Sequence, residues 1–140
     1  MIKNQSNYDG YLFAVRSTLA CNPNILSFAV DYDFGAGERL GVTALQLLND
    51  GEWHHACGVV DRDAETVHLY VDGVEDIGAI GCGAASTNST GYGSSNSGTT
   101  PFLIGKRFNH ASSLWNGEID EVRIYNRALS VEEVQVLLNL

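Results

Sequence analysis

The sequence predicts an all-β protein, a two-sheet antiparallel sandwich that ends in a short C-terminal helix. Short segments alternate apolar and polar residues, as half-buried strands do. Turn signals separate these segments, and the 140 residues include 15 glycines. Helical patterning is sparse outside the C-terminus. At this length we expect one domain spanning residues 1–140, with a single core.

The first half of the chain contains three predicted strands after a polar lead-in of ten residues. We place them at Tyr11–Arg16, Ile25–Asp31 and Leu40–Leu48. The second alternates most clearly, because three large apolar residues share one face: Leu26, Phe28 and Val30. The third is open to another interpretation, since residues 44–48 also suit a helical turn. A strong turn signal follows at residues 49–51, Asn-Asp-Gly.

A β-meander is predicted next. Its strands are Trp53–Asp61, Thr66–Asp72 and Val74–Ile80, and Asp72-Gly73 provides the tight turn between the last two. Alternation in the middle strand places its apolar residues on one face: Val67, Leu69 and Val71. Residues 81–100 are rich in Gly, Ser, Thr and Asn, which predicts a long surface loop. We expect a short strand at residues 101–106 and a connecting loop at residues 107–116.

The last predicted strand is Glu118–Tyr125. Neither of its faces is cleanly apolar, but its β-branched residues favour strand over helix. Ser130 then has the character of an N-cap, and Glu133, three residues later, completes a capping box. Apolar residues recur beyond it at helical spacing: Val131, Val134, Leu137 and Leu138. The chain is therefore predicted to end in a short amphipathic helix.

Three blocks of sequence together carry a resemblance to a known family. They read DGEWHHACGVV, VHLYVDGV and GEIDEVRIYNRALS, in that order. This set resembles the laminin-G-like, concanavalin-A-like lectin/glucanase domains, and the likeness is good from about residue 45 to residue 138. The resemblance implies a jelly-roll sandwich and places Trp53 in the core. It also suggests an extracellular protein, although the first ten residues contain no signal peptide.

The chain departs from this family at its N-terminus. Relatives carry two or three further strands before the position of Tyr11, near the strand that Glu118–Tyr125 would form. Their absence would expose a sheet edge, and exposed edges invite pairing with another chain. We therefore expect that a homo-oligomer could form through this edge.

Composition excludes several classes of partner. The chain has 8 Lys and Arg against 17 Asp and Glu, a net charge of −9 and a pI near 4.6. A nucleic-acid footprint needs a basic stripe, so nucleic acid is not expected. No apolar run is long enough to span a membrane, so membrane insertion is not expected either.

The chain has three cysteines, Cys21, Cys57 and Cys82. They allow at most one disulfide or remain as packed thiols.

Glu118 and Asp120 are candidates for catalytic carboxylates. Laminarinase-type glycoside hydrolases of this superfamily use a strand reading E-x-D-x-(x)-E, and retaining hydrolysis needs two carboxyl groups about 5–5.5 Å apart. Here the second glutamate is missing, because Val122 and Arg123 occupy its place. His54 and His55 are adjacent and would face opposite sides of a strand, so we interpret them as packed histidines. We do not expect an enzyme.

The resemblance also raises calcium as a cofactor. Domains of this type often hold Ca²⁺ with hard oxygen ligands. Asp120 matches a family position for such a ligand, and Asp31 and Asp33 form a D-x-D pattern in a loop. The alternative for each is a solvated carboxylate in a turn.

We expect a non-catalytic, lectin-like module that binds a carbohydrate or glycoconjugate. Sugar recognition combines an aromatic platform with polar side chains that fix the hydroxyl groups. The loops offer five candidates for these roles: Tyr92, Asn109, His110, Trp115 and Asn116. Trp115 has a second interpretation as a core residue at the base of its loop. The first alternative for the whole chain is a protein-interaction or oligomerisation module. The second, less favoured, is a degenerate or active glycoside hydrolase.

Overall fold

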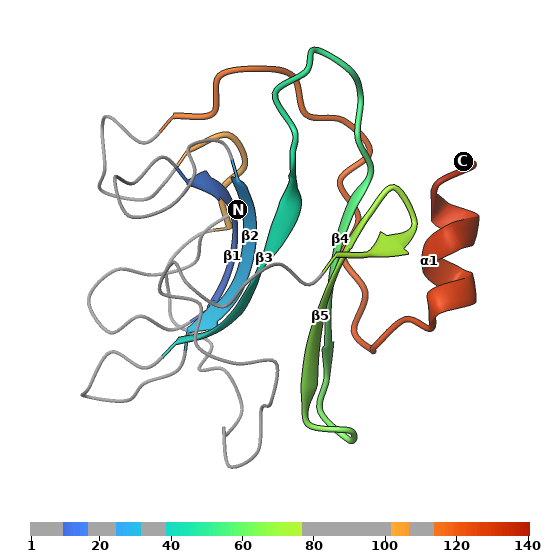
Figure 1. Cartoon of the computed structure of the whole chain (residues 1–140). Helices are drawn as coiled ribbons and strands as arrows, with labels where there is room; N and C mark the ends of the chain where they lie inside the picture. Colours follow the sequence, from blue (N-terminus) through green and yellow to red (C-terminus); the bar gives the residue numbers. More distant parts are fainter. Residues whose placement is uncertain (1–9, 17–24, 32–38, 77–101, 107–113) are drawn as a thin grey trace.

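The computed structural model describes residues 10–16, 25–31, 39–76, 102–106 and 114–140. Within these ranges the chain forms two three-stranded antiparallel sheets and one C-terminal helix, which confirms the predicted all-β sandwich. The sheets lie face to face, and the helix covers the outer side of the second sheet (Figure 1). None of the helices in the described ranges has the length and apolarity to cross a membrane.

The first sheet consists of β1 (Gly10–Arg16), β2 (Ile25–Asp31) and β3 (Arg39–Leu47), in that order. These bounds lie within one residue of the predicted strands. β2 is central, with Phe28 opposite Phe13 on β1. Its pairing with β3 shifts register between Ile25 and Ser27. Because β2 is sandwiched between two neighbours, even its small residues Ser27 and Ala29 are buried.

The second sheet consists of β4 (Ala56–Asp61), β5 (Thr66–Val71) and β6 (Val74–Glu75). The hairpin between β5 and β6 turns on Asp72 and Gly73, whose φ values are +50° and +75°. Two central residues with positive φ are what a type I′ turn requires, which explains the Asp-Gly pair. The order of strands in the predicted meander is confirmed, but β4 begins three residues later than predicted. β6 ends at Glu75, and residues 77–80 of the predicted strand Val74–Ile80 lie outside the described residues.

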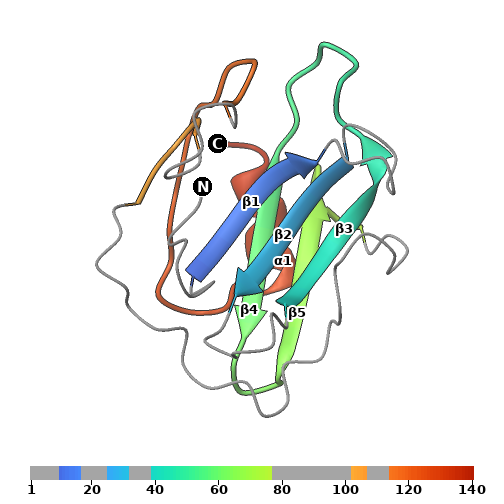
Figure 2. The same ribbon diagram turned by 90° about the vertical axis from the view of Figure 1, so that its left-hand side faces the viewer.

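The main core lies between the two sheets (Figure 2). β5 contributes the apolar face predicted from its alternation, and β2 and β3 supply the opposite wall. The buried members of this cluster are Leu26, Phe28, Val30, Val42, Ala44, Val67, Leu69 and Val71.

A second, smaller core lies on the outer face of the second sheet, under α1 (Val131–Leu137). Val134 of the helix is fully buried and clusters with Val59 and Tyr70. The predicted capping box is present: Ser130 Oγ accepts from the backbone N–H of Glu133, and the Glu133 carboxylate accepts from the backbone N–H of Ser130. The helix thus begins where the sequence predicts.

The strand predicted at Glu118–Tyr125 is wrong. The segment makes no strand pairing among the described residues, and Glu121 has φ of +49°, which interrupts an extended backbone. Figure 2 shows this stretch on the side of β4 that faces away from β5, without an arrow. A strand needs a hydrogen-bonded neighbour, and β-branched residues alone do not provide one. The strand predicted for residues 101–106 reduces to a single bridge, Lys106 with Leu114, within the described part.

Cys57 is a free thiol on β4, and burial raises its pKa. It packs against the smaller core beside Ala128 and Leu129, as a small apolar residue would. The loop predicted at residues 81–100, together with Cys21 and Cys82, lies outside the described residues.

Candidate functional site

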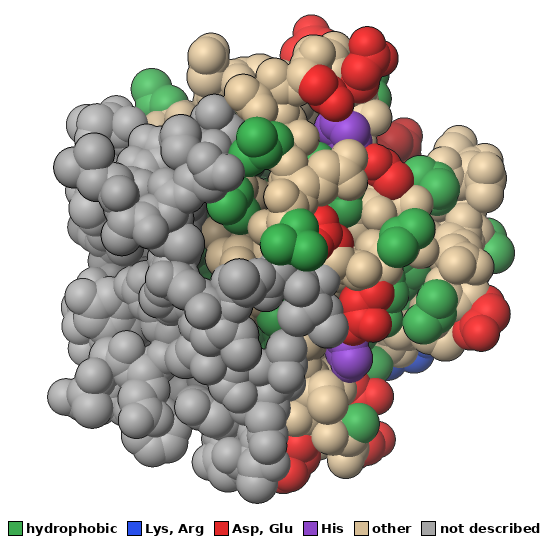
Figure 3. Space-filling view, viewed as in Figure 1, with side chains coloured by type: hydrophobic (Ala, Val, Ile, Leu, Met, Phe, Trp, Pro, Cys, Tyr) green, Lys and Arg blue, Asp and Glu red, His purple; other side chains and the backbone are tan. Residues whose placement is uncertain are grey.

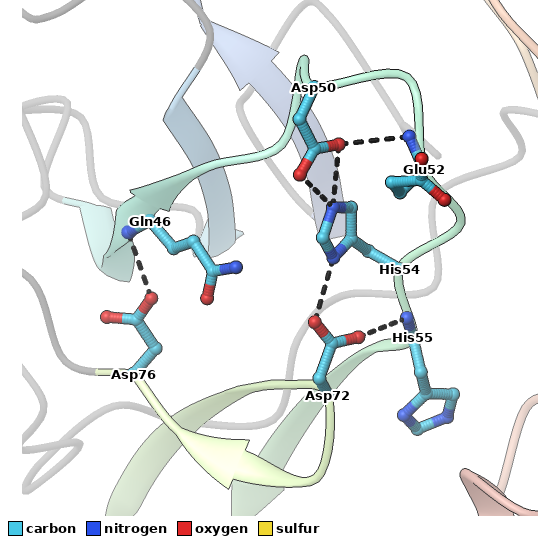
Figure 4. Close-up of polar contacts among 7 residues, drawn as sticks. All are labelled: Gln46, Asp50, Glu52, His54, His55, Asp72 and Asp76. Carbon is cyan, nitrogen blue, oxygen red and sulfur yellow. Dashed lines mark hydrogen bonds and ion pairs between the residues drawn. The ribbon is translucent and has the colours of Figure 1, made fainter.

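The most organised polar cluster of the described chain is built on His54, in the loop between β3 and β4. Its Nε2 lies 3.0 and 3.1 Å from the two carboxylate oxygens of Asp50, and its Nδ1 lies 2.8 Å from Oδ2 of Asp72. Asp50 belongs to the same loop, whereas Asp72 belongs to the β5–β6 turn. We call these three residues the His54 brace, because they tie the loop to the turn (Figure 4).

Backbone hydrogen bonds fix the loop on both sides of His54. The Glu52 N–H donates to Oδ1 of Asp50 over 3.0 Å, a local contact typical of aspartate in turns. The His55 N–H donates to Oδ1 of Asp72 over 2.9 Å, and the Asp72 N–H donates back to the His55 carbonyl over 2.9 Å. Asp72 is therefore a residue of the turn whose carboxylate binds both the loop backbone and the histidine ring.

The electrostatics of the brace favour the charged histidine. Hydrogen bonds to Asp72, and next to Asp50, raise the pKa of His54 above its ordinary value. The backbone N–H of Glu52 and the His54 ring lower the pKa of Asp50. By contrast, burial lowers the pKa of neighbouring His55. On the face shown in Figure 3 acidic side chains gather over the β3–β4 loop.

A second set of hydrogen bonds links the end of β3 to the segment just after β6. The Asp76 carboxylate, just after β6, accepts from the backbone N–H groups of Leu45 (2.7 Å) and Gln46 (3.1 Å) at the end of β3. The Asp76 N–H donates to the Leu69 carbonyl. The loop between β3 and β4 is thus anchored where β3 ends and again at His54, and Figure 4 shows both anchors.

Trp53 lies in this loop, and the prediction that it belongs to the core is wrong. Its side chain is 65% exposed. The backbone of residues 53–55 is diverted toward Asp50 and Asp72 instead of pairing in β4, so the tryptophan precedes the strand and does not take its inward direction. Trp53 directly precedes His54, so the exposed indole is next in the chain to the central residue of the brace.

Of the five predicted sugar-binding residues, two lie in the described part. Trp115 is 41% exposed, and its backbone N–H donates to the Gly105 carbonyl over 2.7 Å. Asn116 follows it and is also exposed. The interpretation of Trp115 as a buried core residue does not hold. Tyr92, Asn109 and His110 lie outside the described residues, so the structure does not show whether the five come together.

The predicted calcium ligands can be followed at one position. Asp120 is exposed, and its Oδ1 accepts from the backbone N–H of Glu121. The Asp31 side chain and all of Asp33 lie outside the described part. Within the described ranges, no three His, Cys, Asp or Glu residues gather as a metal site would require. Calcium stays a prediction.

The carboxylates weighed for catalysis are exposed. Glu118 and Asp120 lie in the segment that does not form a strand, so the strand spacing on which that chemistry depends is not established there. Glu121 forms an ion pair with Arg123. Glu118, Asp120 and Glu121 are therefore surface acids.

The sequence did not predict the His54 brace or the exposure of Trp53. Asp50 and His54 stand four residues apart, and Asp72 occupies the turn after a clear strand. Those spacings were visible, but nothing in them shows that a turn 18 residues later reaches the same imidazole. His54 is held on both ring nitrogens, as the interpretation of a satisfied histidine requires.

The match to a family model agrees with this architecture. The family model described as the concanavalin A-like lectin/glucanases superfamily, of the laminin G type, matches residues 1–135. One similar solved structure is an S-layer domain-containing protein from Clostridium thermocellum, with 21% identity and a TM-score of 0.46. The alignment covers 99% of this chain but only 66% of that one. No curated protein matches the chain.

Proposed function

Because the chain belongs to the concanavalin A-like lectin/glucanase superfamily, we propose that it is a non-catalytic module that binds carbohydrate. One observation carries the proposal: both tryptophans of the chain, Trp53 and Trp115, present their indoles to solvent. Fold membership alone would not support a function, because this superfamily includes both binding and hydrolytic domains.

Exposed tryptophan is the feature that sugar binding uses. An indole is large and apolar and is highly buried on average, so its exposure at two positions calls for a functional reason. The flat π face accepts the C–H face of a pyranose ring, while nearby carboxylates and amides accept and donate to hydroxyl groups. Asp50 and Glu52 stand beside Trp53 in the sequence, and Asn116 stands beside Trp115.

The carboxylates support binding rather than hydrolysis. Glycoside hydrolysis needs one carboxyl group kept protonated by its surroundings and a second one close by. Asp50 and Asp72 are engaged with one histidine, and Asp76 holds two backbone amides. Glu118 and Asp120 are exposed to water, where nothing in the described surroundings isolates one of them as an acid.

A glycan array probed with the purified chain tests the proposal. We expect wild type to bind a defined class of sugar, and the Trp53→Ala, Trp115→Ala double variant to lose that binding while keeping its circular dichroism spectrum. A repeat with EDTA tests calcium, which Asp120 would help to hold. A blank array from folded protein would overturn the proposal, as would release of reducing sugar from a bound glycan that stops in Glu118→Gln.

A second candidate, a module that pairs with another copy of itself, rests on a different observation. Residues 118–125 expose several apolar side chains in a segment that no described strand pairs: Ile119, Val122, Ile124 and Tyr125. Unpaired apolar segments of this kind are sites of chain association. Light scattering would show a dimer that Ile124→Lys converts to a monomer. A monomer at all concentrations would exclude this candidate.

A further inference from the structure

We propose that the β3–β4 loop is the carbohydrate site, with Trp53 as its stacking platform, and that the protonated form of His54 holds this platform in place. The inference rests on the proposed function and goes further, because it selects one of the two exposed tryptophans and names a condition for binding. His54 acts here as a positioning residue.

The first step is the hydrogen-bond requirement of the brace. Each ring nitrogen of His54 faces a carboxylate, and an ionised carboxylate is an acceptor only. Neutral imidazole carries a single N–H, so it can donate to Asp50 or to Asp72 but not to both. Both contacts of the observed geometry are therefore satisfied only by imidazolium, which has two N–H donors.

The groups that face His54 come from two elements. Asp50 approaches from the β3–β4 loop and Asp72 from the β5–β6 turn, and both attract a proton to the ring. His55 follows in the loop and contacts Asp72 through its backbone N–H. Burial, and to a smaller extent Arg123, lower the pKa of His55, although Asp72 acts in the opposite direction. The pKa values of the two neighbouring histidines thus shift in opposite directions, and the charged form is favoured at His54.

The second step concerns Trp53, which is held from both sides. The preceding residue, Glu52, donates its N–H to Asp50, and the following residue, His54, is bound through its ring. An aromatic residue whose backbone is already fixed loses less conformational entropy when a ligand binds, so it makes a better platform. The segment that follows Trp115 forms no strand, and Trp115 is the less exposed of the two.

The third step is the supply of hydrogen-bond acceptors. The His54 side chain is only 12% exposed, whereas the side chains of Asp50 and Asp72 are 49% and 38% exposed. The carboxylates thus keep part of their surface free for sugar hydroxyl groups while they hold the histidine. A carboxylate oxygen accepts more than one hydrogen bond, so the brace does not exhaust them.

The pH range follows from these groups. An ordinary histidine has a pKa near ~6.5. His54 has a raised pKa, so the intact brace persists through neutral pH and fails as the pH rises through that raised value. Neutral His54 can donate to only one of the two carboxylates. The loop then loses either the hydrogen bond between His54 and Asp50 or the one that joins it to Asp72 in the turn.

The test is the same immobilised glycan array, probed at pH 6.0 and pH 9.0 with five proteins: wild type, Trp53→Ala, Trp115→Ala, His54→Gln and His54→Arg. We expect Trp53→Ala to weaken binding by about tenfold or more, the order of effect of losing a stacked aromatic ring, and Trp115→Ala to weaken it less. Wild type should bind more weakly at pH 9.0, and His54→Gln should bind weakly at both pH values. His54→Arg, which keeps two donors and its charge, should remove the pH dependence. Circular dichroism shows that each variant is folded.

The outcomes separate the two proposals. If wild type binds no glycan at either pH, the proposed function fails and this inference fails with it. If wild type binds but Trp115→Ala abolishes binding and Trp53→Ala does not, the carbohydrate module stands and the β3–β4 site is wrong. Equal wild-type binding at the two pH values, with His54→Gln unchanged, would overturn the role of His54.

Discussion

Gly58 on β4 lies directly against the ring of Phe28 on β2, across the interface between the two sheets. A Cβ atom at position 58 would stand 2.5 Å from Cγ of Phe28, closer than carbon atoms approach without repulsion. The missing side chain is therefore what allows the buried phenylalanine to fill the space between the sheets. Phe28 also contacts Phe13, with ring centroids 5.0 Å apart, so its ring has a neighbour on that side as well.

Gly58→Ala should destabilise the protein by about 1–3 kcal/mol, as overpacking of a well-filled core does. Replacing glycine in a strand also brings a small gain in backbone entropy, which this overlap outweighs. Urea unfolding followed by circular dichroism measures the change. The double variant Gly58→Ala, Phe28→Leu is the control, because the smaller side chain relieves the overlap and the two effects should not add. A loss below about 0.5 kcal/mol for Gly58→Ala would contradict the close contact.

Helix α1 offers a matched pair of valines that tests how it docks. Val134 is fully buried against Val59 and Tyr70, whereas Val136, two residues later, is exposed. Val134→Ala should cost about 1–3 kcal/mol through lost burial and a residual cavity. Val136→Ala should change the free energy of unfolding by less than about 0.5 kcal/mol. Equal effects of the two changes in urea unfolding would mean that the helix does not pack on this sheet.

Acid should weaken the same helix in a defined pH range. Hydrogen bonds from Arg127, and then from the Ser130 N–H, lower the pKa of Glu133 from 4.5 to about 2. A lowered pKa in the folded state means that the stabilisation is present above about pH 4.5 and is lost as the pH falls toward about 2. We expect the thermal midpoint of wild type to decrease over this range, and Glu133→Gln to show a smaller decrease. Glu118→Gln is the control, since it removes one exposed carboxylate elsewhere. An unchanged pH profile in Glu133→Gln would contradict the role of this carboxylate.

Elements specified by neighbouring residues could be predicted from the sequence. β5 alternates cleanly and leads into Asp72-Gly73, the pair that a two-residue turn with positive φ prefers. Ser130 and Glu133 form a capping box within four residues, and the helix begins there. In both cases a local pattern of neighbouring residues indicates the element.

Features that depend on distant partners could not be predicted in this way. Residues 118–125 have strand-like composition, but a strand exists only where another strand meets it. Trp53 was assigned to the core because the resemblance places it in a strand, and the hydrogen bonds of Asp50 and Asp72 hold its backbone in a loop instead. The brace joins positions 18 residues apart, and no spacing in the sequence indicates that contact.

Asp76 provides the last test, because its carboxylate joins the two sheets through backbone amides alone. It accepts from the N–H groups of Leu45 and Gln46 on β3, and its own N–H donates to Leu69 on β5. Asp76→Ala leaves two exposed amides without this acceptor and should destabilise the protein by about 0.5–1.5 kcal/mol. Asp63→Ala is the matched control, since it removes the same charge from the exposed β4–β5 turn and should cost less than about 0.5 kcal/mol. Hydrogen exchange gives a local readout: the amides of Leu45 and Gln46 should exchange faster in Asp76→Ala and remain unchanged in Asp63→Ala. Unaltered exchange at both amides would show that this carboxylate does not hold the end of β3.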